Sequence, residues 1–156
     1  MLKRLLALFL SGLTFVLPLA LTLYALYWLL ASVERLFHEA ADRYGVVDLL
    51  VNCAGNRRIG PTETLPLADW DFVSDVALKG AFLCCRSYSR RLLEHRRPGA
   101  IVNTTSVMGE VSLPGRASYT ASRAGVIGLT RSLAVEWATR GIRVNAVGPG
   151  FIRTEQ

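Results

Sequence analysis

Gly99-Ala-Ile-Val-Asn-Thr-Thr-Ser106 is a short apolar run that ends in hydroxyl side chains, and this run decides the fold. Its first half, residues 99–103, is predicted to form a strand. Comparable runs lie upstream, Val46-Val-Asp-Leu-Leu-Val51, and downstream, Ile142-Arg-Val-Asn-Ala-Val147. Short and mostly apolar strands such as the upstream one are typical of a parallel sheet that is covered on both faces.

Helical segments are predicted before the first strand and between the strands. Apolar residues recur at helical spacing from residue 33 to 44, before Gly45. Further helices are expected at about 67–78, with Asp69 or a neighbour as cap, at about 80–95, and at 117–140, closed by Gly141. The alternation of strands and helices predicts an α/β fold: a partial Rossmann-like parallel sheet with flanking helices and right-handed crossovers.

Polar residues and glycines follow each predicted strand. Asn52 comes after the first strand, Ser106 after the second, and Pro149-Gly150 after the third. Because ligands bind at the carboxyl ends of the strands in such sheets, we expect these positions to converge on one rim.

Composition narrows the class of protein. The chain has 156 residues, which is room for one domain, with 51% hydrophobic and 19% charged residues, so it is not a disordered chain. The net charge of +6 is mostly spread along the chain. The densest basic run, within residues 86–97, has no interleaved aromatic residue beyond Tyr88, so we expect no nucleic-acid partner. The three cysteines are predicted to be reduced, and the isolated His38 and His95 predict no metal site.

Residues 5–31 contain no charged side chain. As a helix this segment would be about 40 Å long, enough to cross a hydrocarbon core of about 30 Å with a tilt or a kink at Pro18. We therefore predict one hydrophobic transmembrane-type helix before the α/β part, which gives a transmembrane segment at 1–32 and a second domain at 33–156. The protein is then membrane-associated. Flanking charges do not fix its orientation, because Lys3 and Arg4 lie at one end and Arg35 and Arg43 at the other.

Three further motifs accompany Ser106: Asn52-Cys-Ala-Gly55, Tyr119-Thr-Ala-Ser-Arg123 and Val144-Asn-Ala-Val-Gly-Pro-Gly150. Their order and spacing closely resemble the short-chain dehydrogenase/reductase family over about residues 33–156. The resemblance implies an oxidoreductase that uses NAD or NADP to interconvert a small carbonyl compound and an alcohol. It also implies a cytoplasmic location for the soluble part if the chain is active, because nicotinamide cofactors are cytoplasmic.

The resemblance assigns roles to individual residues. Tyr119 would be the proton donor, Ser106 would position the substrate oxygen, and Arg123 stands where the family has a lysine. A tyrosine needs a nearby cation to act near neutral pH, because its ordinary pKa is about 10, and arginine keeps the charge but not the lysine's geometry. The cofactor-binding residues implied by the family motifs are Asn52, Ala54, Gly55, Pro149, Gly150, Ile152 and Thr154.

Two departures from the family pattern bear on activity. Ala77 occupies the place of an asparagine that steadies a proton relay, and no glycine-rich phosphate-binding turn precedes Gly45. We therefore expect an impaired oxidoreductase. The alternative is a non-catalytic, truncated or fused membrane-anchored protein. Residues 1–35 support this alternative, because they resemble the first membrane-spanning segment of a family of small bacterial membrane proteins of uncharacterised function.

A third hypothesis is a partner-binding module. In the family, the helices that correspond to residues 80–95 and 117–140 commonly build the subunit interface, so an oligomer through these helices is possible. The substrate itself, and the choice between NAD and NADP, cannot be read from these residues.

Overall fold

The computed structural model describes residues 32–153, and the chain divides into two compact units, Met1–Glu39 and Ala40–Gln156. The predicted span over residues 5–31 and the resemblance of residues 1–35 to a membrane protein fall almost wholly outside the described part. No helix within residues 32–153 combines the length and the apolar character that crossing a membrane requires. Residues 32–44 are helical, as their spacing predicted, and Gly45 follows in the left-handed conformation with a φ of 76°.

Three parallel strands form the sheet of the second unit, in the order β1 (Leu49–Asn52), β2 (Gly99–Thr104) and β3 (Ile142–Val147). This confirms the predicted Rossmann-like parallel sheet. The first strand begins at Leu49 and not at the predicted Val46. Its partner β2 starts only at Gly99, which follows Pro98, so the residues before Asp48 have no strand to pair with.

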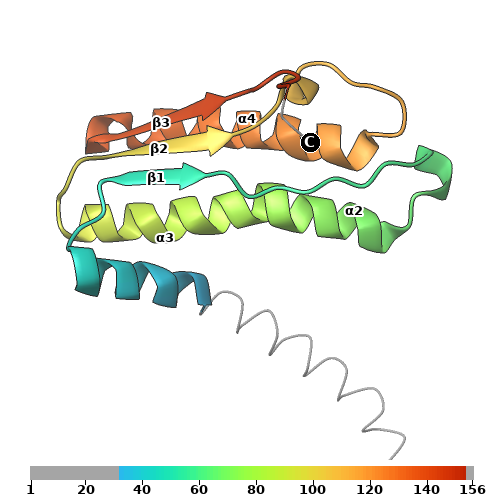
Figure 1. Ribbon diagram of the computed structural model, residues 1–156. Helices are drawn as coiled ribbons and strands as arrows, with labels where there is room; N and C mark the ends of the chain where they lie inside the picture. The colour runs from blue at the N-terminus through green and yellow to red at the C-terminus, as the bar shows by residue number, and fades with distance from the viewer. Residues whose placement is uncertain (1–31, 154–156) are drawn as a thin grey trace, which may run out of the picture. The chain divides into compact units, whose positions relative to one another are not determined.

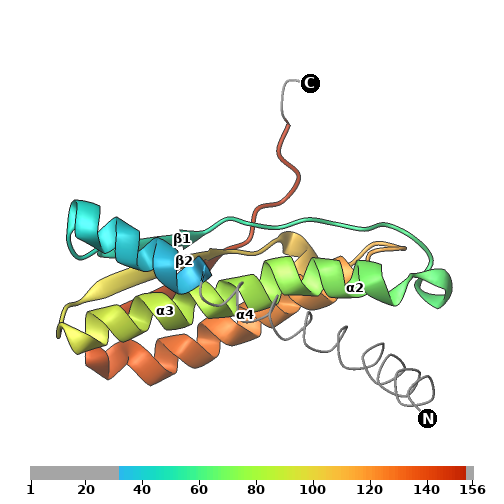
Figure 2. The same ribbon diagram turned by 90° about the horizontal axis from the view of Figure 1, so that it is seen from below.

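The helices α3 (Gly80–Glu94) and α4 (Ala117–Trp137) lie side by side in one layer against the sheet (Figures 1 and 2). Ile101 and Ile142 point into this layer and are fully buried. On the other face, Leu49, Val51 and Val147 are each about half exposed, at 51%, 50% and 54%. The expectation of a sheet covered on both faces is therefore wrong for the described residues, which cover one face only.

The two helices expected at 67–78 and 80–95 form one continuous rod. It consists of α2 (Leu67–Ser74), the π-helical turn η2 (Asp75–Lys79) and α3. Gly80 keeps right-handed helical angles and does not interrupt the rod. Pro66, and not Asp69, occupies the N-cap position of α2, without a side-chain capping bond. Proline suits a helix start because its fixed φ matches the first turn and it has no N–H to satisfy.

The predicted helix over 117–140 is found as α4 followed by the 3-10 turn η4 (Ala138–Arg140). Gly141 ends it with a φ of 81°, a left-handed conformation that glycine adopts without steric penalty. The chain then enters β3 at once, so the helix end sets the strand's position in the sheet.

Candidate functional site

The ends of β2 and β3 are joined by backbone hydrogen bonds directly at the rim. The Thr105 N–H donates to the Val147 carbonyl at 2.8 Å, and the Val107 N–H donates to the Pro149 carbonyl at 3.0 Å. These bonds hold the segment around Ser106 against the segment around Pro149. The positions that follow the second and third strands therefore lie together, as parallel strand ends should.

Ser106 caps the short helix η3 (Val107–Gly109) with its side chain. Its hydroxyl oxygen accepts a hydrogen bond from the Met108 N–H at 3.2 Å. A hydroxyl group carries one donor as well as its acceptor sites, so the Ser106 hydrogen can still be donated to a ligand. The cap fixes the oxygen while leaving the donor available, which suits a residue that orients a carbonyl oxygen.

Tyr119 and Arg123 lie one helical turn apart in α4. The Arg123 guanidinium carbon is 5.0 Å from the centre of the Tyr119 ring, and Arg123 Nη1 donates to the Thr104 carbonyl at 2.8 Å. Arg123 is only 6% exposed, and its Nε is buried without a hydrogen-bond partner among the described residues. The cation is therefore held over the ring face and pinned to the end of β2.

Gly55 leaves the room that the Arg123 side chain occupies. A Cβ atom added at Gly55 would collide with Arg123 Nη2, so a larger residue there would displace the guanidinium. Beside this contact is an open cavity of about 250 Å³. Its lining consists of Gly55, Asn56, Arg57, Tyr119 and Arg123.

The loop after Gly55 is anchored to α2 on both sides of Arg57. Asn56 Nδ2 donates to the Phe72 carbonyl at 3.3 Å, and Arg58 Nε pairs with Asp69 at 3.1 Å. The Arg58 guanidinium also lies 4.6 Å from the centre of the Phe72 ring. These contacts fix the loop that carries Arg57 next to the cavity.

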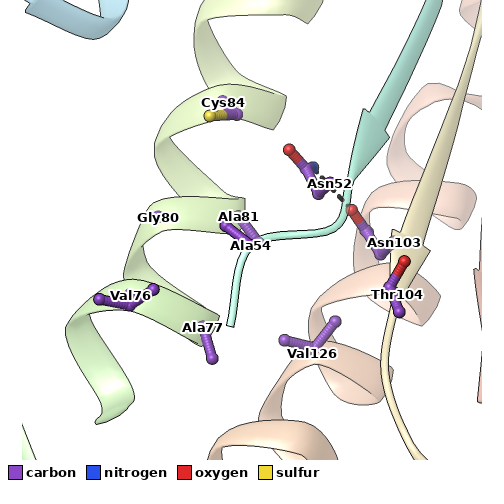
Figure 3. Close-up of a pocket in the computed structure, with 10 residues that line it drawn as sticks. All are labelled: Asn52, Ala54, Val76, Ala77, Gly80, Ala81, Cys84, Asn103, Thr104 and Val126. Atoms are coloured by element: carbon purple, nitrogen blue, oxygen red, sulfur yellow. Dashed lines mark hydrogen bonds between the residues drawn. The ribbon is translucent and has the colours of Figure 1, made fainter. Parts of the chain in front are cut away.

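Ala77 lies in the π-helical turn η2 and is 3% exposed. It lines a second, smaller cavity of about 80 Å³ between the helices and the strand ends. Figure 3 shows Ala77 and Ala54 on one side of this space, with Asn103, Thr104 and Val126 on the other. A π-turn often marks a functional position in a helix, and here the alanine leaves space and offers no side-chain hydrogen bond.

A buried polar chain, which the sequence reasoning missed, ties the strands to α4. Asn52 Nδ2 donates to Asn103 Oδ1 at 2.8 Å, and Asn103 Nδ2 donates to the Thr130 hydroxyl at 2.9 Å (Figure 3 shows the first of these bonds). Asn52 thus points towards the helix layer and joins β1 to β2. The one signal in the sequence was an asparagine in each of the two neighbouring strands at the same register.

Cys85 lies against the same chain and is fully buried. Burial raises the pKa of its thiol to about 12, and hydrogen bonding with Asn52 and Asn103 opposes this rise only in part. Burial also raises the pKa of Cys84, whereas Cys53 is exposed. The three cysteines are free, as the sequence predicted.

Of the other predicted site residues, one lines the smaller cavity, and the residues after Pro149 lie outside both cavities or outside the described part. Ala54 faces the smaller cavity. Gly150 and Ile152 are exposed, Ile152 at 71%, and an added Cβ at Gly150 would touch nothing within 4 Å. Thr154 lies beyond the described residues. Within residues 32–153, no group of three or more acidic, histidine or cysteine side chains is placed to hold a metal ion.

Comparison with known proteins finds the same region in many oxidoreductases. The family model described as short chain dehydrogenase matches residues 29–156. A 3-oxoacyl-acyl-carrier-protein reductase of Synechocystis is 44% identical over 124 residues, which are 80% of this chain and 50% of the reductase. The chain spans about half the length of the curated relatives it matches.

Two solved structures share the fold. The crystal structure of a putative short-chain alcohol dehydrogenase from Sinorhizobium meliloti matches with a TM-score of 0.76 at 39% identity, over 80% of this chain and 49% of that one. A 4-hydroxyisoleucine dehydrogenase complexed with NADH matches with a TM-score of 0.75 at 38% identity, over 81% of this chain and 56% of that one.

Proposed function

The chain belongs to the short-chain dehydrogenase family, and on that premise we propose that it interconverts a small carbonyl compound and an alcohol with NAD or NADP. The observation that carries this proposal is the arrangement around one cavity. Tyr119 and Arg123 on α4 meet Gly55 from the end of β1 beside about 250 Å³ of open space. Carbonyl reduction needs a proton donor near the developing alkoxide, and a nearby cation helps a tyrosine to serve as that donor.

The residues present fit the nicotinamide end of such a cofactor. The cavity at the carboxyl ends of the strands is smaller than a dinucleotide, so it can take only one end of the cofactor, and the Arg123 side chain already fills the room beside Gly55. When bound, NADH or NADPH supplies a hydride. Tyr119 would then donate a proton to the carbonyl oxygen, and Ser106 would orient that oxygen through its free hydroxyl hydrogen. The residues that the family motifs assign to the cofactor are Asn52, Ala54, Gly55, Pro149, Gly150, Ile152 and Thr154.

Two features predict a low rate of carbonyl reduction. Ala77 leaves a cavity of about 80 Å³ where a hydrogen-bonding side chain would support proton transfer. The Arg123 guanidinium is committed to the Thr104 carbonyl and the Tyr119 ring face. Arginine also does not release its proton at physiological pH, so it supplies charge but no proton exchange.

A non-catalytic, membrane-anchored protein is the second candidate. It is favoured by residues 5–31, which carry no charged side chain, and by the same two departures at Ala77 and Arg123. In both candidates the chain is membrane-associated through residues 5–31. The catalytic candidate additionally requires the α/β part to lie on the cytoplasmic side.

In both candidate functions, the chain associates with a partner through the helix layer. Phe82 on α3 is 42% exposed, and together with Leu78 and Leu129 it lines an open apolar groove of about 380 Å³. Apolar surface of this kind favours a partner that buries it. The proposed partner is a second copy of this chain or a longer relative.

The experiment is a cofactor-oxidation assay with the full chain in mild detergent, using NADH and NADPH over a panel of ketones. We expect slow turnover that falls at least about a hundredfold in Tyr119→Phe, because a positioned acid contributes about 10²–10⁴-fold. An active reductase of the family serves as the assay control. Absence of turnover in the wild-type chain would favour the non-catalytic candidate, and equal turnover in Tyr119→Phe would contradict the role of Tyr119 as proton donor.

A further inference from the structure

The larger cavity beside Tyr119 is unusually cationic for its size. Two of its five lining residues, Arg57 and Arg123, are arginines, and none is acidic. Neither arginine forms an ion pair with any carboxylate in the described part of the chain. Arg123 is withdrawn from water without a counter-ion, which is costly, so this arrangement favours a ligand that brings the negative charge.

Arg123 is almost completely buried, which strengthens the argument for an anionic ligand. Its guanidinium donates one hydrogen bond, from Nη1 to the Thr104 carbonyl, which leaves Nε buried and without a partner. A guanidinium has five N–H donors in a planar fork that matches a carboxylate or a phosphate. One neutral carbonyl and one ring face satisfy only part of that capacity.

Arg57 is held where it can act together with Arg123. Its neighbours Asn56 and Arg58 are both bonded to α2, so the loop backbone at Arg57 is fixed beside the cavity. Asn56 also contributes a side-chain oxygen, Oδ1, that is buried without a donor. The cavity thus offers two cationic groups and one unsatisfied acceptor.

We propose that Arg57 and Arg123 form an anion subsite beside Tyr119 that binds the carboxylate of a small oxo or hydroxy acid. The carboxylate pairs with the two guanidinium groups, and the hydroxyl of the hydroxy acid donates to Asn56 Oδ1. This inference deepens the proposed function by naming the substrate class of the same site. It concerns binding, so it can be tested whether or not the chain turns substrate over.

The test measures binding of acetoacetate to the full chain in mild detergent by ligand-observed NMR, without cofactor. Methyl acetoacetate is the uncharged control ligand, and inorganic phosphate is the second anion. We expect acetoacetate to bind at least about tenfold more tightly than its ester, because charge-assisted hydrogen bonds are the strong ones. Phosphate that binds more tightly than acetoacetate would overturn the assignment to a carboxylate and point to a cofactor phosphate.

Variants locate the subsite. Arg57→Gln and Arg123→Gln should each weaken acetoacetate binding about tenfold and leave the binding of the ester unchanged. Arg143→Gln is the matched control, because Arg143 is an exposed arginine of β3 outside the cavity lining, and it should bind like the wild type. Arg57 is exposed, so Arg57→Gln keeps the test decisive if Arg123→Gln does not fold. Unchanged acetoacetate binding in Arg57→Gln would overturn the proposal.

Discussion

At the scale of single residues, Arg123 decides how much chemistry this site can perform. The guanidinium lies over the ring of Tyr119, donates a hydrogen bond to the Thr104 carbonyl and fills the space beside Gly55. Lysine has a compact ammonium on a flexible stem and can exchange a proton. We expect Arg123→Lys to raise the rate of ketone reduction by about tenfold or more, measured as initial NADPH oxidation by purified protein.

The control for this substitution is Arg131→Lys on the same helix, because Arg131 is exposed and lines neither of the two cavities. It should leave the rate unchanged. A rate for Arg123→Lys at or below that of the wild type would mean that the arginine is already accommodated. The limiting step would then lie elsewhere, for example at Ala77.

Cys85 gives a residue-scale prediction that does not depend on activity. Burial raises its thiol pKa to about 12, above the ordinary value of 9.0, so the thiol stays protonated in the folded protein at moderately alkaline pH. At pH 8, iodoacetamide should modify the exposed Cys53 and leave Cys85 unmodified until the chain is unfolded. Peptide mass spectrometry distinguishes the sites, and rapid modification of Cys85 in the folded chain would contradict this assignment.

The same pKa has a consequence for stability. The unfolded chain releases the Cys85 proton at lower pH than the folded chain does, so the stabilisation is complete below about pH 9. It is lost as the pH rises towards 12. The loss of stability between pH 7 and pH 12 should therefore be smaller for Cys85→Ala than for the wild type. Each protein is compared with its own stability at pH 7.

At the scale of elements, the sequence predicted the regular parts and missed what depends on contacts between them. The long helix over 117–140 and the strand from Ile142 were found where spacing and Gly141 placed them. The break expected near residue 79 was absent, because a π-turn absorbs the irregularity without ending the helix. The site was predicted as a set of strand-end residues, but the position of the Arg123 side chain depends on Gly55 and Thr104, which are distant in sequence.

Gly141 offers a test of the helix-to-strand junction. Its φ is 81°, and an added Cβ would meet only ordinary contacts with Pro98 at 3.7 Å, so the penalty of Gly141→Ala comes from the backbone alone. We expect a loss of about 1–2 kcal/mol in the free energy of unfolding, measured by urea denaturation. The matched control is Gly128→Ala in α4, where an added Cβ meets nothing within 4 Å. It should stabilise the protein by up to about 1 kcal/mol, and equal effects of the two substitutions would contradict the argument.

At the scale of the whole molecule, the sheet of the described part is covered on one face and has two outer strands. The mostly apolar run of the first strand predicted burial on both faces, but an apolar run shows what a strand can bury and not which segment covers it. Leu49, Val51 and Val147 remain about half exposed on the open face. Only β2 has a neighbouring strand on each side within residues 32–153. An open apolar face beside unpaired strand edges is a surface for association.

Self-association through this open face is therefore the expected behaviour of the purified chain at high concentration. Val51→Lys places a charge on the open face in the outer strand β1, next to Val102 in the sheet register, and should shift the chain towards monomer. The measurement is analytical ultracentrifugation in density-matched mild detergent over a range of concentrations. Ile59→Lys is the control, because Ile59 is equally accessible, at 58%, but lies in the loop after β1. If both variants associate to the same extent as the wild type, the assembly does not use the sheet face. The apolar groove lined by Leu78, Phe82 and Leu129 is then the surface to substitute next.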